Sequence, residues 1–412
     1  MKSQKLYDEI DSHLKNIVLK FWVDHGFDYE NEVFYPLIGR KGEALHPENK
    51  KYETRSCILC ARLLWTFSKA YARFQKDEYK KCADIAYNNL MKYFYDEKNG
   101  GFYWSIDYLL KNPDTRKHLY VQSFVIYGLA EYYIAFKNED ALNKANELFD
   151  IINEKCRDRI NGGFYENFDS DWNRIAKFAL APPYIDCDKT MNSMLHFMEG
   201  LTLLYIAEKS GGKKNEVKKV IYEIVGIIFS KMINEDMTSL YMYYTKDFKR
   251  VSDSRSPGHD IETSWLICRT CDTLGDKNLI RKARDFAFRA VEGVIKNGYD
   301  TNKTIITSIG DTQKNEKMKM LRDWWAEAEG IVGLYNIYQI TGDEYFFKKC
   351  LELWETTKRL YVDFEYGEWF SFTVENEEEN LIIREHGNKA SFWKCPYHNS
   401  RMCFELLGRM EE

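Results

Sequence analysis

Two histidines in this chain share the same local sequence. His259 and His398 each stand two residues after a proline, in Pro-Gly-His at 257–259 and Pro-Tyr-His at 396–398. Because proline is favoured in the first turn of a helix, both imidazoles are expected near a helix N-terminus. The positive end of the helix dipole there disfavours the imidazolium and lowers its pKa. The pattern therefore predicts two neutral imidazoles that can act as bases at pH 7.

Three more residues have side chains that suit acid–base chemistry. Glu262 follows His259 by three residues, so on a helix it would be a neighbour that orients the ring. His196 lies in an otherwise apolar helical pattern, and Arg62 in CARLLWTF is a cation that needs a carboxylate or an anionic ligand. A purely structural alternative stays open for the histidines, as helix-capping or solvated residues or, for His196, as a hydrogen-bonded core residue.

Motifs for other chemistries are missing from the sequence. It contains no Walker A loop, no G-x-G-x-x-G, no His-Glu-x-x-His and no G-x-S-x-G. Two Cys-x-x-Cys pairs, Cys57/Cys60 and Cys268/Cys271, lie far apart in apolar helical patterns, so we expect free thiols in the core rather than a zinc site. The prediction is an acid–base enzyme with no cofactor and no metal.

Charge and hydropathy argue against several classes of protein. A net charge of −5 disfavours a nucleic-acid partner, which needs a basic surface. No apolar run approaches the roughly 18 residues of a membrane span, and the first residues, MKSQKLYDEIDSHLK, lack the apolar segment of a secretory signal. We therefore expect a soluble, cytoplasmic monomer that binds neither nucleic acid nor membrane.

An internal repeat indicates which elements carry the candidate residues. Asn-Gly-Gly-Phe-Tyr occurs at 99–103 and 161–165, with weaker echoes at 297–299 and 366–370. Each follows two apolar-periodic stretches joined by a short polar turn, so the unit is helix, turn, helix and Gly/aromatic loop. The first helices of the pairs are predicted at 53–74, 118–137, 189–209, 258–274, 324–341 and 397–410. Their partners are predicted at 78–95, 140–156, 214–231, 277–296 and 343–361.

One further helix, predicted at 5–24, can pair only with the last one. A row of pairs whose two ends complete each other indicates a closed ring, whereas an open solenoid would need polar caps. We therefore predict an all-α fold, an (α/α)6 barrel of twelve helices in six antiparallel pairs, as a single domain over residues 1–412. Short β-hairpins are expected in the Gly/aromatic loops at one end.

In such a ring the first helices of the pairs form the inner wall and begin at one mouth. The candidate residues all fall near the beginnings of these helices, a coincidence not expected of scattered structural residues. In addition to the residues above, they are Tyr120, Asn192, Trp265, Trp324, Trp325, Glu329 and Trp393. Aromatic residues make up 16% of the chain, and rings of this kind commonly line sugar sites.

The chain resembles the cellobiose 2-epimerases, within the N-acylglucosamine 2-epimerase superfamily. The matching strings run in order along nearly the whole chain: ARLLWTF (61–67), HLYVQSFVIYGLAEYY (118–133), KTMNSMLHFMEGLTLLY (189–205), GHDIETSWLI (258–267), RDWWAEAEGIVGLYN (322–336) and KASFWKCPYHNSRMCFEL (389–406). The resemblance implies an (α/α)6 barrel and an activity. That activity interconverts glucose and mannose at the reducing end of β-1,4-linked disaccharides, through an enediolate and without a cofactor.

The resemblance also implies roles for the candidates. His259 and His398 match the general acid/base histidines, His196 a histidine of ring opening or substrate positioning, and Arg62 the arginine that steadies the open-chain oxygen. The other matched positions correspond to residues that contact the sugar or hold the histidines: Tyr120, Asn192, Glu262, Trp265, Trp325, Glu329 and Trp393. Glu327 stands where glutamine is expected, and Cys395 where glycine is common, which leaves the sugar preference open.

Other functions remain compatible with the residues alone. An aldose–ketose isomerase acting on mannose or glucose, or an N-acylglucosamine 2-epimerase, would use the same chemistry. A glycoside hydrolase would need two carboxylates flanking the bond, for which Glu262 and Glu329 are candidates. A binding scaffold of the TPR type would explain the helix pairs, but not the histidines and tryptophans at one end.

Overall fold

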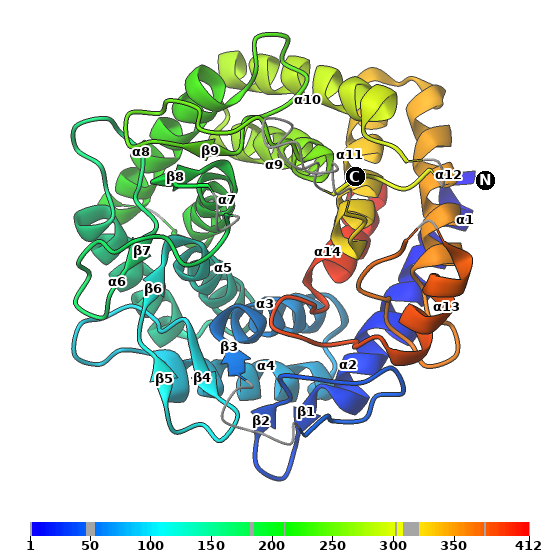
Figure 1. Ribbon diagram of the computed structural model, residues 1–412, viewed down its shortest axis with the longest axis horizontal. Helices are drawn as coiled ribbons and strands as arrows, with labels where there is room; N and C mark the ends of the chain where they lie inside the picture. The colour runs from blue at the N-terminus through cyan, green and yellow to red at the C-terminus, as the bar shows by residue number, and fades with distance from the viewer. Residues whose placement is uncertain are drawn as a thin grey trace.

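Six helices stand side by side around the centre of the molecule in the computed structural model (Figure 1). They are α3 (Cys57–Phe74), α5 (Leu119–Phe136), α7 (Met191–Ala207), α9 (Pro257–Leu274), α11 (Trp324–Thr341) and α14 (Tyr397–Glu411). Each packs against the next, and α14 packs against α3, so the ring is closed. The structure describes residues 2–46, 54–181, 185–209, 211–300, 303–307, 321–374 and 376–411.

A second layer of helices surrounds this inner wall (Figure 1). Its members are α4 (Asp77–Asn89), α6 (Glu139–Lys155), α8 (Gly212–Ile227), α10 (Lys277–Asn297) and α12 (Glu344–Leu360), together with a continuous N-terminal helix. The N-terminal helix consists of α1 (Lys2–His13), the π-helical η1 (Leu14–Leu19) and α2 (Lys20–His25). It packs on α14. The described residues therefore form six pairs of an inner and an outer helix, and the predicted (α/α)6 barrel is confirmed.

Capping side chains fix where the inner helices begin. Ser56, Thr190 and Ser256 each accept a hydrogen bond from the backbone N–H three residues further on, over 3.0, 3.1 and 3.3 Å. Such caps satisfy N–H groups that a helix leaves without partners at its first turn. His118 caps α5 in the same way, because its Nδ1 accepts the N–H of Tyr120 over 3.1 Å. The caps thus place the first turns, which carry the candidate residues.

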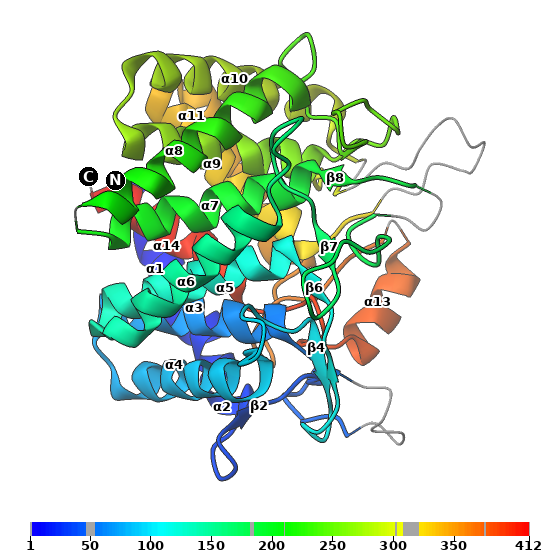
Figure 2. The same cartoon turned by 90° about the vertical axis from the view of Figure 1, so that its left-hand side faces the viewer.

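The β-strands are short, and most of them gather at the end of the barrel where the inner helices begin (Figure 2). They form antiparallel sheets of β1 (Phe27–Asp28) with β2 (Val33–Phe34), β3 (Thr54–Ser56) with β4 (Ser105–Asp107) and β5 (Pro113–Asp114), β6 (Lys117–His118) with β7 (Asn167–Phe168), and β8 (Lys189–Thr190) with β9 (Tyr243–Tyr244). The predicted hairpins at one end are therefore confirmed.

Two details of the helix prediction are wrong. Three predicted helices begin too early: residues 54–56, 118 and 189–190 lie in strands β3, β6 and β8, and the helices begin after the caps Ser56, His118 and Thr190. Residue 53 lies outside the described parts. A helix without a predicted counterpart, α13 (Glu377–His386), lies among the loops at the strand end (Figure 2). Its sequence EEENLIIREH lacks the repeating apolar stripe that revealed the other helices.

Buried lysine–aspartate pairs hold the loops at this end. Lys117 contacts Asp96 and Lys189 contacts Asp158, each over 2.7 Å with both side chains buried. Each lysine also donates to a loop carbonyl 2.7 Å away, that of Ser170 or of Gly162. Breaking a buried pair of this kind costs about 3 to 5 kcal/mol. The loops around the mouth are therefore firmly attached to the inner wall.

The cysteines behave as the sequence predicts. All ten fall within the described residues, none forms a disulfide, and both Cys-x-x-Cys pairs are buried on separate inner helices, α3 and α9. No helix in the described parts of the chain combines the length and the apolar composition that a membrane span requires.

Candidate active site

A cavity of about 460 Å³ opens where the inner helices begin. Ten of the twelve candidate residues line it: Arg62, Tyr120, Asn192, His196, His259, Glu262, Trp324, Trp325, Trp393 and His398. Leu180, Thr307, Leu321 and Asp323 complete its described lining. The remaining two candidates, Trp265 and Glu329, are buried behind the wall. The ring thus brings together residues that are up to 336 positions apart in the sequence, as the repeat predicted.

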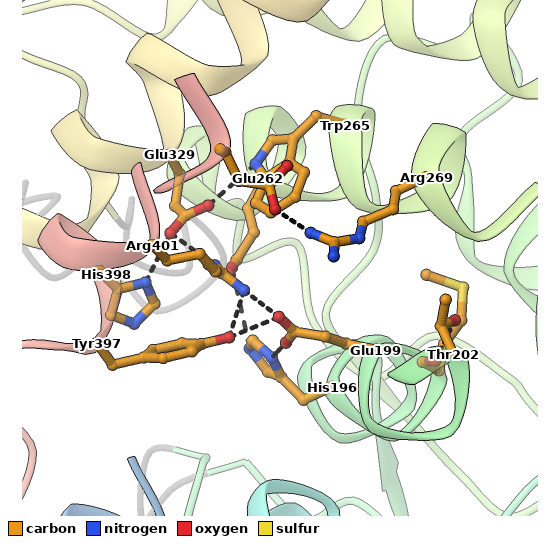
Figure 3. Close-up of polar contacts among 12 residues, drawn as sticks. His196, Glu199, Thr202, Glu262, Trp265, Arg269, Glu329, Tyr397, His398 and Arg401 are labelled. Atoms are coloured by element: carbon orange, nitrogen blue, oxygen red, sulfur yellow. Dashed lines mark hydrogen bonds and ion pairs between the residues drawn. The ribbon is translucent and has the colours of Figure 1, made fainter. Parts of the chain in front are cut away.

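His398 is held by a carboxylate behind the cavity wall. Its Nδ1 lies 2.7 Å from Oε1 of Glu329 (Figure 3). Trp265 donates its indole N–H to the other oxygen of Glu329 over 3.0 Å. A carboxylate that accepts from Nδ1–H fixes the tautomer in which Nε2 carries a lone pair. Nε2 of His398 is therefore the nitrogen available to a ligand.

His259 is held by a hydroxyl group instead. Its Nδ1 lies 2.5 Å from Oγ of Ser256, which donates its own proton to the carbonyl oxygen of Thr307 over 2.5 Å. The hydroxyl must therefore accept from Nδ1–H, which again leaves the lone pair on Nε2. The expectation that Glu262 orients His259 is wrong. The cap residue Ser256 takes the ring nitrogen, and Glu262 contacts Arg401 instead, over 2.6 Å.

His196 is also backed by a carboxylate. Its Nδ1 lies 2.8 Å from Oε2 of Glu199, and its Nε2 lies 3.9 Å from Oε2 of Glu262 (Figure 3). The side chain is buried, yet it lines the cavity. Its position therefore favours a functional role over that of a core histidine.

All three imidazoles are neutral at pH 7. Burial lowers the pKa of His259 to about 3, with a smaller contribution from nearby His196. Burial lowers the pKa of His196 to about 4, although Glu199 acts against it. Burial and the positive charge of Arg62 hold the pKa of His398 well below its usual range. The sequence predicted that the pKa values of His259 and His398 are lowered, and this direction agrees. The main cause, however, is burial rather than the helix dipole.

Arg62 is a buried cation without a carboxylate partner in the described parts of the chain. Its guanidinium donates to the hydroxyl of Tyr120 over 2.8 Å and lies 4.3 Å from the ring centre of Phe124. Its Nε has no partner among the described residues. A buried cation is costly unless an opposite charge compensates it. Of the two partners that the sequence left open, the structure thus favours a ligand that carries or develops negative charge in the cavity.

Two acceptor oxygens on the cavity lining are also left without hydrogen-bond partners in the described structure. They are Oδ1 of Asn192 and Oε2 of Glu262, both buried. Hydroxyl groups of a bound ligand could donate to each of them. Burial, together with the neighbouring charge of Glu329, raises the pKa of Glu262 well above its ordinary value. Burial also raises the pKa of Glu329, to about 7.

The four candidate tryptophans occupy different positions. Trp393 is at the rim, where 38% of its surface is exposed, and Trp324 is nearly buried. Trp325 lies against both catalytic candidates, with ring centres 4.7 Å from His259 and 5.7 Å from His398. Trp265 is fully buried, and its contact with Glu329 favours a supporting role over the direct sugar contact that we expected.

The sequence did not single out several residues that complete the site. Glu199 and Arg401 lie three residues after His196 and His398, a spacing that could have revealed them. Ser256 is the cap residue immediately before Pro257, again a readable signal. Asp323 lines the cavity, and burial raises its pKa to about 6.

The chain is similar to known proteins over its full length. A family model described as N-acylglucosamine 2-epimerase (GlcNAc 2-epimerase) matches residues 34–398. A cellobiose 2-epimerase of Dictyoglomus turgidum is 34% identical, with 100% of both chains covered. The crystal structure of a sugar epimerase from a ruminal bacterium has a TM-score of 0.87 at 32% identity and covers 98% of this chain and 99% of its own. The structure of cellobiose 2-epimerase from Bacillus thermoamylovorans has a TM-score of 0.86 at 30% identity and covers 98% and 100%.

Proposed function

The chain belongs to the N-acylglucosamine 2-epimerase family and is an epimerase, and we propose that it inverts C2 of the reducing-end sugar in β-1,4-linked disaccharides. Cellobiose would give glucosyl-mannose, and lactose would give epilactose. The observation that carries this proposal is the pairing of His259 and His398. Both hold Nδ1 in a hydrogen bond, both lie against Trp325, and both line the same cavity.

Inversion at C2 needs a proton removed from one face of the carbon and returned to the other. After ring opening, the C1 carbonyl acidifies the C2 proton, and one histidine accepts that proton at Nε2. The other histidine is neutral in the free protein, so it must first take up a proton from solvent at Nε2; it then gives that proton to the opposite face of C2, and the first histidine releases its own to solvent. The negative charge that develops on the enediolate favours the imidazolium form in this buried site. His259 and His398 would thus act as the pair.

Arg62 would stabilise the intermediate. The enediolate carries its negative charge on O1, and Arg62 is a buried cation without a carboxylate partner among the described residues. A fixed donor in a water-poor site stabilises such an oxyanion by several kcal/mol. The hydroxyl of Tyr120 holds the guanidinium in place.

His196 would serve ring opening or position the substrate. Its Nδ1 is held by Glu199, so Nε2 remains free to exchange a proton with a sugar oxygen. Asn192 and Glu262 offer unpaired acceptor oxygens for sugar hydroxyls, and Trp324, Trp325 and Trp393 supply rings for stacking. No step in this scheme uses a metal or an organic cofactor.

The geometry weakens the hydrolase alternative. A glycosidase needs its two carboxyl groups on either side of the scissile bond. Here Glu262 and Glu329 both accept from the same nitrogen of Arg401, each over 2.6 Å, and Glu329 lies behind the wall. They are therefore on the same side of the cavity.

Incubation with cellobiose or lactose in D2O tests the proposal. We expect deuterium at C2 and a disaccharide with mannose at its reducing end. Absence of both would contradict the proposal, whereas a ketose as the main product would show an aldose–ketose isomerase, and release of monosaccharides a hydrolase. We also expect His259→Ala and His398→Ala each to abolish turnover with an unchanged helical circular dichroism spectrum.

We further propose that the protein acts as a cytoplasmic monomer. Its ten free thiols fit a reducing compartment. The net charge of −5 fits a small neutral ligand better than a nucleic acid. Light scattering after size exclusion, with and without cellobiose, tests the oligomeric state.

A further inference from the structure

Arg401 lies behind the active-site cavity at the meeting point of three buried carboxylates. One terminal nitrogen of its guanidinium donates to Oε1 of Glu262 and to Oε1 of Glu329, each over 2.6 Å. The other terminal nitrogen donates to Oε1 of Glu199 and to the hydroxyl of Tyr397. Arg401 itself is completely buried and does not line the cavity (Figure 3).

Two of these carboxylates use a second contact to hold a histidine. Glu199 contacts Nδ1 of His196 over 2.8 Å, and Glu329 contacts Nδ1 of His398 over 2.7 Å. The two histidines come from different inner helices, α7 and α14, while Arg401 is on α14. One guanidinium therefore stands at the base of both histidine–carboxylate pairs.

We propose that Arg401 is a positioning residue that fixes the tautomer and orientation of His196 and His398 together, by holding Glu199 and Glu329. The proposal rests on the proposed epimerase function, because it explains how the ring-opening histidine and one of the proton-transfer histidines stay aligned. A planar guanidinium suits this task because its donors form a rigid fork. A lysine ammonium in the same place is a single point of charge and cannot hold the carboxylates in fixed directions.

The charges at this point support the role. Burial opposes ionisation of Glu199, but Arg401 together with the contacts to His196 and Tyr397 outweighs it and lowers the pKa of Glu199 to about 2. Burial raises the pKa of Glu329 to about 7, although Arg401 acts against it. Burial also raises the pKa of Glu262, helped by the charge of Glu329. Without Arg401, all three carboxyl groups would be expected to take up protons more readily.

His259 provides an internal control. Its Nδ1 is held by Ser256 and makes no hydrogen bond to any carboxylate that Arg401 contacts. A loss of Arg401 should therefore disturb His196 and His398 but leave the ring of His259 in its tautomer. A general distortion of the site would disturb all three.

The test uses Arg401→Lys and Arg401→Met in the full chain, labelled with ¹⁵N-histidine. In the wild type we expect NMR signals of the Nδ1–H tautomer for all three histidines. In Arg401→Lys we expect mixed tautomers for His196 and His398, an unchanged His259, and a kcat for cellobiose lower by roughly 10- to 100-fold with KM little changed. In Arg401→Met we expect the pH midpoint of kcat/KM to rise by roughly 1 to 3 units.

Arg269→Met is the matched control. Arg269 is a partly buried arginine of an inner helix, and it pairs with Glu405 on α14 rather than with a carboxylate that holds a histidine. We expect this variant to lose thermal stability but to keep the histidine signals and the pH midpoint.

Three results would overturn the proposal. They are unchanged tautomers of His196 and His398 in folded Arg401→Lys, an equal disturbance of His259, and an unshifted pH midpoint in folded Arg401→Met. Should Arg401→Met not fold, Arg401→Lys decides. The NMR signals do not depend on turnover, so a wild type without epimerase activity would contradict the proposed function and leave the positioning role to be judged by the tautomers.

Discussion

Trp265 donates its indole N–H to Glu329 over 3.0 Å, through the carboxylate oxygen that His398 does not contact. Glu329 is thereby held from behind by Trp265 and by Arg401 while it holds the imidazole in front. Trp265, which by sequence resembles a sugar-stacking tryptophan, is thus part of the support for His398, one of the two proposed proton-transfer histidines.

Trp265→Phe separates these two roles, because it keeps an aromatic ring and removes only the N–H donor. We expect kcat for cellobiose to fall up to about tenfold, the equivalent of one hydrogen bond, with KM nearly unchanged. Steady-state kinetics measure both constants. A large rise in KM with an unaltered kcat would instead show direct contact with the sugar.

Much of the fold could be read from the sequence because every helix pair repeats the same local pattern. The unpartnered N-terminal helix indicated closure of the ring, and the Gly/aromatic loops indicated hairpins. The start of α3 was misjudged because β3 depends on pairing with Ser105–Asp107, about fifty residues downstream. Helix α13 was missed because its stability does not come from an apolar stripe.

The sequence could predict those site residues whose place depends on their position at the beginning of a helix. It could not predict contacts between residues on different sides of the ring. His196, His259, His398 and Arg62 could be placed at one mouth from the repeat alone. The partners of Arg401 stand 72, 139 and 202 residues away in the sequence, on three other helices. No local pattern specifies such contacts, because only the closed ring brings these carboxylates together.

Trp393 is at the rim of the cavity and 38% of its surface is exposed, so it contributes to ligand contact rather than to the core. We expect Trp393→Ala to raise KM for cellobiose by about 3- to 10-fold, the usual value of one aromatic contact, with a smaller change in kcat. Phe372→Ala is the control, because Phe372 is 43% exposed but does not line the cavity. Equal effects of the two substitutions would contradict a specific role for Trp393.

Glu327 is a buried carboxyl group whose replacement by glutamine should stabilise the protein. Its Oε1 accepts the N–H of Ile305 over 2.9 Å and the hydroxyl of Tyr361, whereas its Oε2 has no partner in the described structure. Burial raises its pKa well above the ordinary value of 4.5. A glutamine can accept the same two hydrogen bonds without the cost of burying an ionisable group.

The sign of the pH dependence follows from proton linkage. Above pH 4.5 the unfolded chain loses the proton of Glu327 while the folded protein keeps it, so this group lowers the free energy of unfolding as the pH rises towards its folded pKa. We expect Glu327→Gln to gain about 1 kcal/mol or more at pH 7 and less at pH 5 in urea unfolding. Glu405→Gln should instead lose stability at pH 7, because Arg269 and Arg409 together lower the pKa of Glu405 against the effect of burial. If the gain in the free energy of unfolding of Glu327→Gln is the same at pH 5 and pH 7, the explanation given for Glu327 is wrong.

Ser256 is the only described side chain whose hydrogen bond holds the ring of His259, so its hydroxyl should matter for catalysis as well as for the helix. Ser256→Ala removes the acceptor of Nδ1–H, and the imidazole can then adopt the tautomer that blocks Nε2. We expect a loss in kcat of about tenfold, equivalent to one hydrogen bond, and a loss in stability of about 1 kcal/mol from the missing cap. Ser256→Thr, which keeps a hydroxyl, should recover most of the activity.

Thr190→Ala distinguishes the two effects of Ser256. Thr190 caps α7 over 3.1 Å as Ser256 caps α9, but its hydroxyl contacts no histidine in the described structure. We expect Thr190→Ala to lower the melting temperature as Ser256→Ala does and to leave kcat within a few-fold of the wild type. If both variants lose activity in proportion to their stability, the hydroxyl of Ser256 acts only as a cap. A loss of kcat confined to Ser256→Ala, and reversed in Ser256→Thr, requires the contact with His259.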